Sequence, residues 1–262
     1  MALLLLVPYF TPADPRRRRE VEETLQANLQ LPEPRQLLLL VDDGQPPPIS
    51  PTGRPAEVIP LTRRPTLADA LHQARRRSQP GDLVLIANSD IAFSESIAGD
   101  LERELPEDAP ALLCITRHNR LPSGALALQR PPQCSQDAWA LRADQLAQLS
   151  PEHLGDCAVP FGVFRCDNVI PFRFHCRGWQ LLNPALRIQA IHNHLSGVRQ
   201  YTSHCTRLLG GGCYVHCNPQ PRQPSDLEMV VSSLSPQPVE RIGINRHLEL
   251  VQEPGPSPAP DH

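Results

Sequence analysis

The chain has 262 residues, 40% of them apolar, with 31 prolines and a formal net charge of −3. This length permits one sizeable core, either one large α/β domain or a domain with an appendage. The nearly balanced charge, with no basic face interleaved with aromatic residues, argues against a nucleic-acid partner.

The N-terminal run and the cysteines bear on cellular location. The run MALLLLVPYF is apolar but short, has no positively charged flank and soon reaches Pro8. We therefore expect a buried first strand there and neither a signal peptide nor a membrane span. The 8 cysteines are spread along the chain, which is typical of reduced thiols in a cytoplasmic protein.

Short apolar runs alternate with helical segments over the first hundred residues. The predicted strands lie at 2–7, 36–41, 56–61 and 82–87. Helical periodicity appears at 16–31 and at 66–78, where Thr66 can cap the helix. Strands that are apolar throughout and alternate with helices predict an α/β fold with a mostly parallel central sheet flanked by helices.

The second half of the chain continues less regularly. The predicted elements are a strand at 111–115, a short strand within 135–142, a helix at 143–150 and a helix at 167–178. Pro171 should interrupt or bend the last of these helices. From Thr202 the periodicity is lost and Gly, Pro and Cys become frequent, so we expect an irregular extension there.

Acidic and polar side chains end two of the predicted strands. Asp42 and Asp43 follow the second strand, and Asn88, Ser89 and Asp90 follow the fourth. Ligands of open parallel sheets bind beyond the carboxyl ends of the strands, so both groups can face one crevice. The alternative is that the second group only ends a strand and caps the next helix.

Further candidate residues are concentrated between 135 and 201. His192 and His194 lie two apart, so a strand would place both imidazoles on one face, either at a metal ion or in hydrogen bonds at a sheet edge. Asp167 opens a predicted helix as a general base or as its N-cap, and Asp137 is the second choice of base. Trp139 either stacks on a sugar or base or belongs to the core.

Two weaker signals complete the inventory of sites. Arg199 can pair bidentately with a diphosphate, although a structural role is as good an interpretation. Cys213 and Cys217 match zinc-ligand spacing only loosely. The chain has neither a Rossmann glycine fingerprint nor a Walker loop.

Several of these segments, in this order along the chain, resemble the GT-A type glycosyltransferases, which move a sugar from a nucleoside diphosphate to an acceptor. The segments are LLLVPYF at 4–10, QLLLLVDDG at 36–44, NSDI at 88–91, SQDAWALR at 135–142, FGVFRCDNVIPFRF at 161–174, GWQLLNP at 178–184 and IHNHLSGVRQY at 191–201. The resemblance implies a single GT-A (Rossmann-like) domain over 1–201. The irregular extension would then occupy 202–250, and a flexible tail 251–262.

The resemblance also implies roles for individual residues. Nucleotide-sugar binding would fall to Pro8, Asp42, Asp43, Asn88, Ser89, Asp90, Trp139, Asn168 and Arg199. A divalent ion, manganese or magnesium, would be held by Asp90 with His192 and His194. The first acid of the family's Asp-x-Asp motif is Asn88 in this chain, so metal binding would depend on Asp90 with help from elsewhere.

The leading prediction is a cytoplasmic, hexosyltransferase-like enzyme that transfers a sugar from a nucleotide-sugar donor to an acceptor hydroxyl. Asp167, or in second place Asp137, would take the proton of that hydroxyl. The alternative is a non-catalytic GT-A-like module that binds a glycan or a protein partner, which the missing acid at position 88 favours. A nucleotidyltransferase is disfavoured, because its glycine-rich, lysine-bearing phosphate loop is absent from the sequence.

Overall fold

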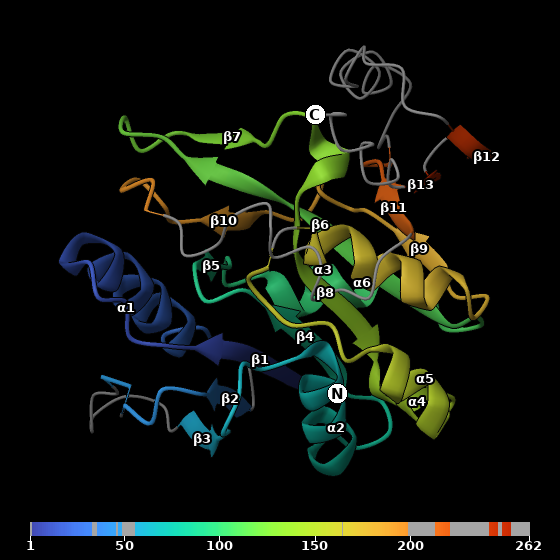
Figure 1. The fold of residues 1–262 in the computed structure, drawn as a ribbon, viewed down its shortest axis with the longest axis horizontal. Coiled ribbons are helices and arrows are strands. Elements are labelled where there is room, and N and C mark those ends of the chain that lie inside the picture. Colours follow the sequence, from blue (N-terminus) through green and yellow to red (C-terminus); the bar gives the residue numbers. More distant parts are fainter. Residues whose placement is uncertain are drawn as a thin grey trace, which may run out of the picture.

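The structure is a computed structural model that describes the chain in segments. These are residues 2–32, 36–45, 47–48, 56–163, 165–198, 213–220, 241–245 and 248–252. Strands and helices alternate along them, and a large mixed sheet has helices on both faces (Figure 1). Among these residues no helix combines the length and the apolarity needed to cross a bilayer. The architecture is the α/β class that the sequence predicts.

In the described part of the chain, ten strands make up the main sheet. They are β1 (Leu3–Tyr9), β2 (Gln36–Val41), β3 (Ala56–Pro60), β4 (Leu83–Ala87), β5 (Ile91–Ala92), β6 (Ala111–Arg120), β7 (Leu126–Leu128), β8 (Gln136–Arg142), β9 (Gln180–Leu182) and β10 (Ala190–His192). Their order is β3-β2-β1-β4-β8-β6-β10-β5, and β7 and β9 also pair with β6. β1 to β4 are parallel, whereas β8 runs antiparallel to both neighbours, β4 and β6. The sheet is therefore mostly parallel, with β8 reversed near its centre, and β5 and β7 also run antiparallel to their partners.

Helices on both faces of the sheet explain why its strands are apolar at every position. The helices are α1 (Pro15–Leu29), α2 (Leu67–Arg77), α3 (Ile97–Glu104), the 3-10 turn η1 (Pro132–Cys134), α4 (Ala143–Leu146), α5 (Pro151–Asp156) and α6 (Cys166–His175). On β2, Leu38 and Leu40 join the core cluster that includes α2 and α6, whereas Leu37 and Leu39 join the cluster that includes α1 and α3. Since alternate residues of a strand point to opposite faces, both sets must be apolar.

Two differences from the predicted elements affect the functional interpretation. The sequence predicts a strand at 111–115, but β6 continues to Arg120. The alternative that Asn88, Ser89 and Asp90 cap the next helix is wrong, because β5 follows them and α3 begins only at Ile97. The polar triplet therefore lies between two strands, at the edge of the sheet.

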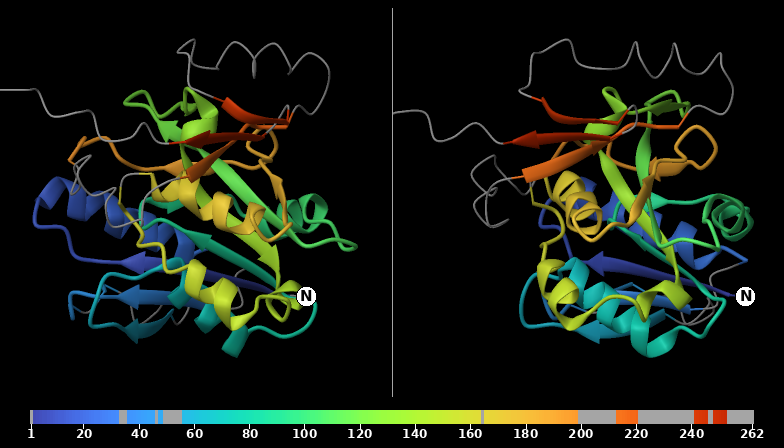
Figure 2. Two further views of the ribbon diagram at one scale, coloured as in Figure 1. Left: turned by 45° about the vertical axis from the view of Figure 1, so that its right-hand side comes forward. Right: turned by 90° about the vertical axis from the view of Figure 1, so that its right-hand side faces the viewer.

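The region after residue 201 holds regular structure where the sequence predicts an irregular extension. β11 (Cys213–Cys217), β12 (Arg241–Asn245) and β13 (Leu248–Gln252) form an antiparallel sheet in the order β11-β13-β12. β11 lies beside α6 (Figure 2). The expectation of irregular structure is wrong for these strands, and the remainder of the predicted tail lies outside the described residues.

Candidate functional site

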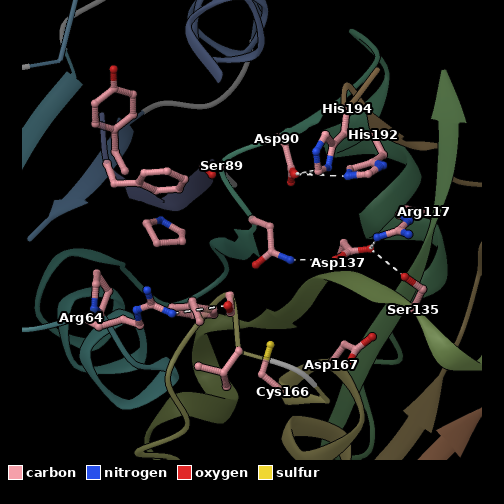
Figure 3. Close-up of a pocket in the computed structure, with 18 of the residues that line it drawn as sticks. Arg64, Ser89, Asp90, Arg117, Ser135, Asp137, Cys166, Asp167, His192 and His194 are labelled. Atoms are coloured by element: carbon pink, nitrogen blue, oxygen red, sulfur yellow. Dashed lines mark hydrogen bonds and ion pairs between the residues drawn. The ribbon is translucent and has the colours of Figure 1, made fainter. Parts of the chain in front are cut away.

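A cavity of about 780 Å³ lies at one edge of the main sheet (Figure 3). The parallel strands β1, β2 and β4 end at this edge, and the antiparallel β8 begins there. β6 runs against β8, and β10 runs parallel to β6, so these two strands also end there. The turns of several separate strands therefore meet at one place, which is where open α/β sheets bind ligands.

Most of the residues predicted from the sequence line this cavity. They are Pro8, Asp42, Asp43, Asn88, Ser89, Asp90, Asp137, Asp167, Asn168, His192 and His194. Asp43 also has a local structural role, because its Oδ2 accepts a hydrogen bond of 2.6 Å from the backbone N–H of Thr11. This bond ties the turn after β2 to the segment after β1. The structure brings the residues together, and their roles in binding a donor remain predictions.

Three of the predicted residues do not contribute to the cavity in the way expected. The stacking role of Trp139 is wrong, because its side chain is fully buried in the core and does not line the cavity. Asn168 lines the cavity, but its amide Nδ2 donates to the carbonyl of Val215 at 3.2 Å and so holds α6 to β11. Arg199 and the side chain of Cys213 lie outside the described residues.

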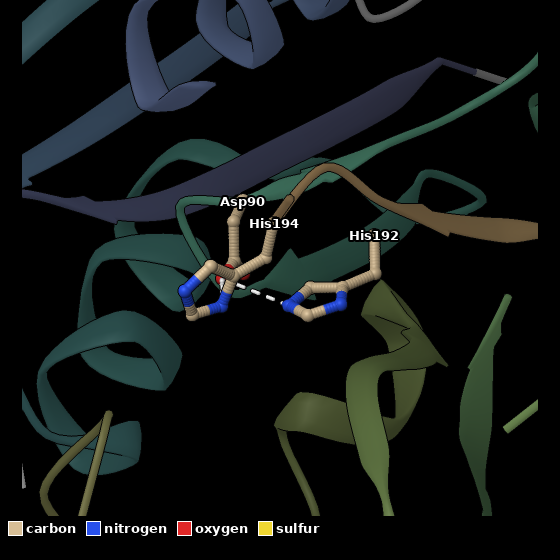
Figure 4. Close-up of side chains that lie close together, drawn as sticks. All are labelled: Asp90, His192 and His194. Carbon is tan, nitrogen blue, oxygen red and sulfur yellow. Dashed lines mark hydrogen bonds and ion pairs between the residues drawn. The ribbon is translucent and has the colours of Figure 1, made fainter. Parts of the chain in front are cut away.

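Asp90, His192 and His194 form a compact group with the geometry of a metal site (Figure 4). One potential ligand atom from each lies within 4.8 Å of the others. His192 Nε2 is 3.1 Å from Asp90 Oδ2, and His194 Nδ1 is 4.0 Å from the same oxygen. His194 lies beyond the end of β10, so the expectation that a strand presents both rings on one face is wrong. The chain turns after β10 and brings the second ring back to the carboxylate.

Hydrogen bonds on the far side of each imidazole orient the group toward a cation. His194 Nε2 donates to the carbonyl of Val198 at 2.9 Å, which leaves the Nδ1 lone pair of the neutral ring facing Asp90. Asn119 Oδ1 lies 3.0 Å from His192 Nδ1, while its Nδ2 donates to Gln129 Oε1 at 2.8 Å. Because that amide accepts from His192 Nδ1, the neutral ring has its Nε2 lone pair toward Asp90. Such outer hydrogen bonds are typical of metal-ligating histidines, so the residues fit a divalent ion.

Arg17 is a residue of this site that the sequence does not single out. Its Nη2 donates to Asp90 Oδ2 at 2.5 Å. Burial by itself raises the pKa of Asp90, but His192 and Arg17 hold that pKa well below its usual range. The available signal is helical phase, since Arg17 lies one turn before the buried Val21 on the inward face of α1.

Asp137 is the centre of a second buried network. Its carboxylate accepts hydrogen bonds from Asn88 Nδ2 at 2.7 Å, Ser135 Oγ at 3.1 Å and Arg117 Nη1 at 3.2 Å. A carboxylate engaged by three donors is suited to positioning its neighbours. The sequence does not single out Arg117, because the predicted strand ends at residue 115 and Arg117 lies in the part of β6 beyond it.

Asp167 lies in the first turn of α6 and lines the cavity (Figure 3). The N-cap position belongs to Arg165, whose φ is 68°, so the alternative that Asp167 is the N-cap is wrong. Burial, followed by the negative charge of Asp137, raises the pKa of Asp167 to about 8. A carboxyl group with this pKa can accept a proton near neutral pH, as a general base must.

Comparisons with known proteins give similarities only in structure, since no family model and no curated protein matches the chain. A mannosyltransferase from Pyrobaculum calidifontis, solved with GDP-Man and Mn²⁺, is 14% identical, with a TM-score of 0.48 over 74% of this chain and 58% of its own. A CMP:2-keto-3-deoxy-manno-octonic acid synthetase with CTP is 10% identical, with a TM-score of 0.44 over 80% and 97%. Residues 1–349 of S. aureus TarS are 12% identical, with a TM-score of 0.41 over 80% and 64%.

The chain spans 58% of the length of that mannosyltransferase. The chain's own strand order, with a reversed strand beside β4 and polar residues at the carboxyl ends of β2 and β4, is that of a Rossmann-like α/β fold. This is the α/β class of fold that the sequence predicts.

Proposed function

We propose that the protein is a glycosyltransferase that moves a sugar, of the hexose class, from a nucleoside diphosphate to an acceptor hydroxyl. One observation carries the proposal: the Asp90, His192 and His194 group and the carboxyl group of Asp167 line the same cavity. A transferase of this kind needs a place for the departing diphosphate and a base for the attacking hydroxyl.

The donor set favours manganese over magnesium. Two imidazoles and one carboxylate suit a transition-metal ion, whereas magnesium prefers an all-oxygen shell that retains several waters. When bound, the ion supplies the Lewis-acid neutralisation of charge on the leaving diphosphate. Asp90, His192 and His194 would hold it, and the hydrogen bonds that the two rings donate to the carbonyl oxygens of Val198 and Asn119 fix their orientation.

The base would be Asp167, and Asp137 would serve it indirectly. Asp167 in its ionised form takes the proton of the acceptor hydroxyl as that oxygen attacks the anomeric carbon. Asp137 is occupied by its three donors, and its negative charge adds to the effect of burial in raising the pKa of Asp167. This refines the sequence prediction, in which either carboxylate can be the base.

The test begins with a thermal-shift screen of nucleotide sugars to identify the donor, since a ligand that binds only the native form raises the melting temperature. Release of the nucleoside diphosphate from that donor is then measured for the wild type and for Asp90→Ala. We expect Asp90→Ala to abolish the release, whereas Asp108→Ala, on an exposed loop, should match the wild type. Full turnover by Asp90→Ala would refute the role given to Asp90.

Calorimetry separates this proposal from the non-catalytic binding module. A transferase should bind a nucleoside diphosphate, and more tightly when Mn²⁺ is present. If none of the common nucleoside diphosphates binds with or without Mn²⁺, the binding module becomes the better interpretation.

A further inference from the structure

Arg17 occupies the same carboxylate oxygen that faces both histidines. Asp90 Oδ2 receives Arg17 Nη2 at 2.5 Å and lies 3.1 Å from His192 Nε2 and 4.0 Å from His194 Nδ1. A divalent ion held by the two rings and Asp90 Oδ2 would share that oxygen with the guanidinium. The same oxygen therefore has two possible cationic partners, one of them built into the chain.

The guanidinium is held firmly in this position. Arg17 is 7% exposed, and its Nη1 donates to Glu20 Oε2 at 3.2 Å and to the carbonyl of Asn193 at 3.4 Å. Glu20 is itself anchored, because its two carboxylate oxygens accept hydrogen bonds from the backbone N–H and the hydroxyl of Ser196. Arg17 therefore bridges two carboxylates and the segment after β10 that carries the metal-ligating ring of His194.

The charges of this group explain why the two cations compete. With both imidazoles neutral, Asp90, Glu20 and Arg17 sum to one negative charge. A divalent ion added beside the guanidinium would turn this into one positive charge in a buried place, where like charges repel strongly. The ion and the guanidinium repel each other most strongly while both are bound to Asp90, and moving the guanidinium away from that carboxylate relieves this repulsion.

We propose that Arg17 is an internal counter-cation, which a divalent metal ion must displace from Asp90 before it can bind. Arg17 keeps its bond to Glu20 in the exchange and turns its freed N–H toward the cavity that it lines. The inference deepens the proposed function and rests on its metal site. Arg17 acts as a positioning residue that weakens binding of the ion on its own.

The test is a titration of the ligand-free protein with Mn²⁺ alone. Binding is measured by electron paramagnetic resonance, which detects the free ion, and by calorimetry. Arg17→Gln removes the positive charge and keeps a polar side chain of moderate length. In Arg17→Gln the ion does not have to break a hydrogen bond between charged groups. We therefore expect this variant to bind Mn²⁺ about tenfold to a hundredfold more tightly than the wild type does. Arg17→Lys keeps the positive charge but loses the forked guanidinium that bridges Asp90 and Glu20. Its Mn²⁺ affinity should lie between those of the wild type and Arg17→Gln.

Matched variants separate the proposal from a general effect of charge. Arg19→Gln removes a cation from the exposed face of the same helix and should bind Mn²⁺ as the wild type does. Adding Asp90→Ala to Arg17→Gln should remove the gain, because the shared ligand is gone. Circular dichroism shows whether each variant is folded, and Arg17→Lys carries the comparison if Arg17→Gln is not.

Equal Mn²⁺ affinity in Arg17→Gln, Arg17→Lys and the wild type would overturn the proposal, as would the absence of Mn²⁺ binding in all three. The titration needs no sugar donor, so its result is independent of turnover. A chain that shows the Arg17 effect but uses no nucleotide sugar would keep this inference and lose the proposed transfer reaction. A chain that turns over a donor without the Arg17 effect would do the reverse.

Discussion

Asp167 gives the clearest quantitative prediction, a rise of activity with pH. Burial and the charge of Asp137 raise the pKa of Asp167 to about 8, and a general base works only in its ionised form. With that pKa, about a tenth of the carboxyl groups are ionised at pH 7 and about nine tenths at pH 9. We therefore expect kcat/KM to rise about tenfold between these two pH values and then to level off.

The perturbation is Asp167→Asn, which keeps the shape of the side chain and removes its basicity. Turnover should fall about 10²- to 10⁴-fold, the usual contribution of a general base, and the alkaline rise should disappear. The assay measures nucleoside diphosphate release from pH 6 to 10 at saturating Mn²⁺, with Asp108→Asn as the exposed control. An asparagine variant that keeps the wild-type pH profile would refute the assignment of the base.

The same pKa makes a second, independent statement about stability. A carboxyl whose pKa is raised on folding contributes stability fully below its unfolded pKa, and this contribution is lost as pH rises through about 8. Asp167→Asn should therefore be no more stable than the wild type at pH 4 and should gain relative to it toward pH 9. Urea unfolding at the two pH values measures this difference without any substrate. A constant difference would mean that the pKa of Asp167 is not raised.

Two further predictions concern the metal ligands and the core. Asn119→Ala removes the acceptor that orients His192, so Mn²⁺ affinity in a calorimetric titration should fall about 10- to 100-fold, and unchanged affinity would contradict the orienting role. Trp139→Ala should lower the free energy of unfolding by about 3–5 kcal/mol in urea, because the ring is fully buried against the β-sheet. A loss below about 1 kcal/mol would show that the site collapses around the cavity or that the ring is not packed as described.

The strands of the sheet are predictable because a strand that is buried on both faces is apolar at every position. On β2, for example, Leu37 to Leu40 must all be apolar, since alternate residues pack against helices on opposite faces. The direction of β8 is not predictable in this way, because an apolar strand has the same pattern whichever way it runs. That direction matters, because it places Asp137, near the start of β8, at the same edge of the sheet as Asn88 and Asp90, which follow the end of β4.

The acids of the site are predictable, whereas their partners are not. Asp90 and Asp43 interrupt or end apolar runs, which makes them visible in the sequence. Arg17 contacts Asp90 across 73 residues, and Asn119 contacts His192 across another 73. Nothing local marks such contacts. One arginine in a row of four becomes important only when the fold turns it inward.

The pKa values of the two acidic centres of the cavity are shifted in opposite directions, and this difference supports the roles proposed for them. Burial raises the pKa of Asp90, but its neighbours His192 and Arg17 hold that pKa well below its usual range, so Asp90 is ionised, as an anchor for a cation must be. Burial, followed by the negative charge of Asp137, makes the ionised form of Asp167 costly and so raises its pKa. Separate pKa values for two acids in one site are the usual sign that one serves electrostatics and the other proton transfer. We expect that exchanging the neighbours of the two carboxyl groups would exchange the roles of anchor and base, whereas exchanging the acids themselves would not.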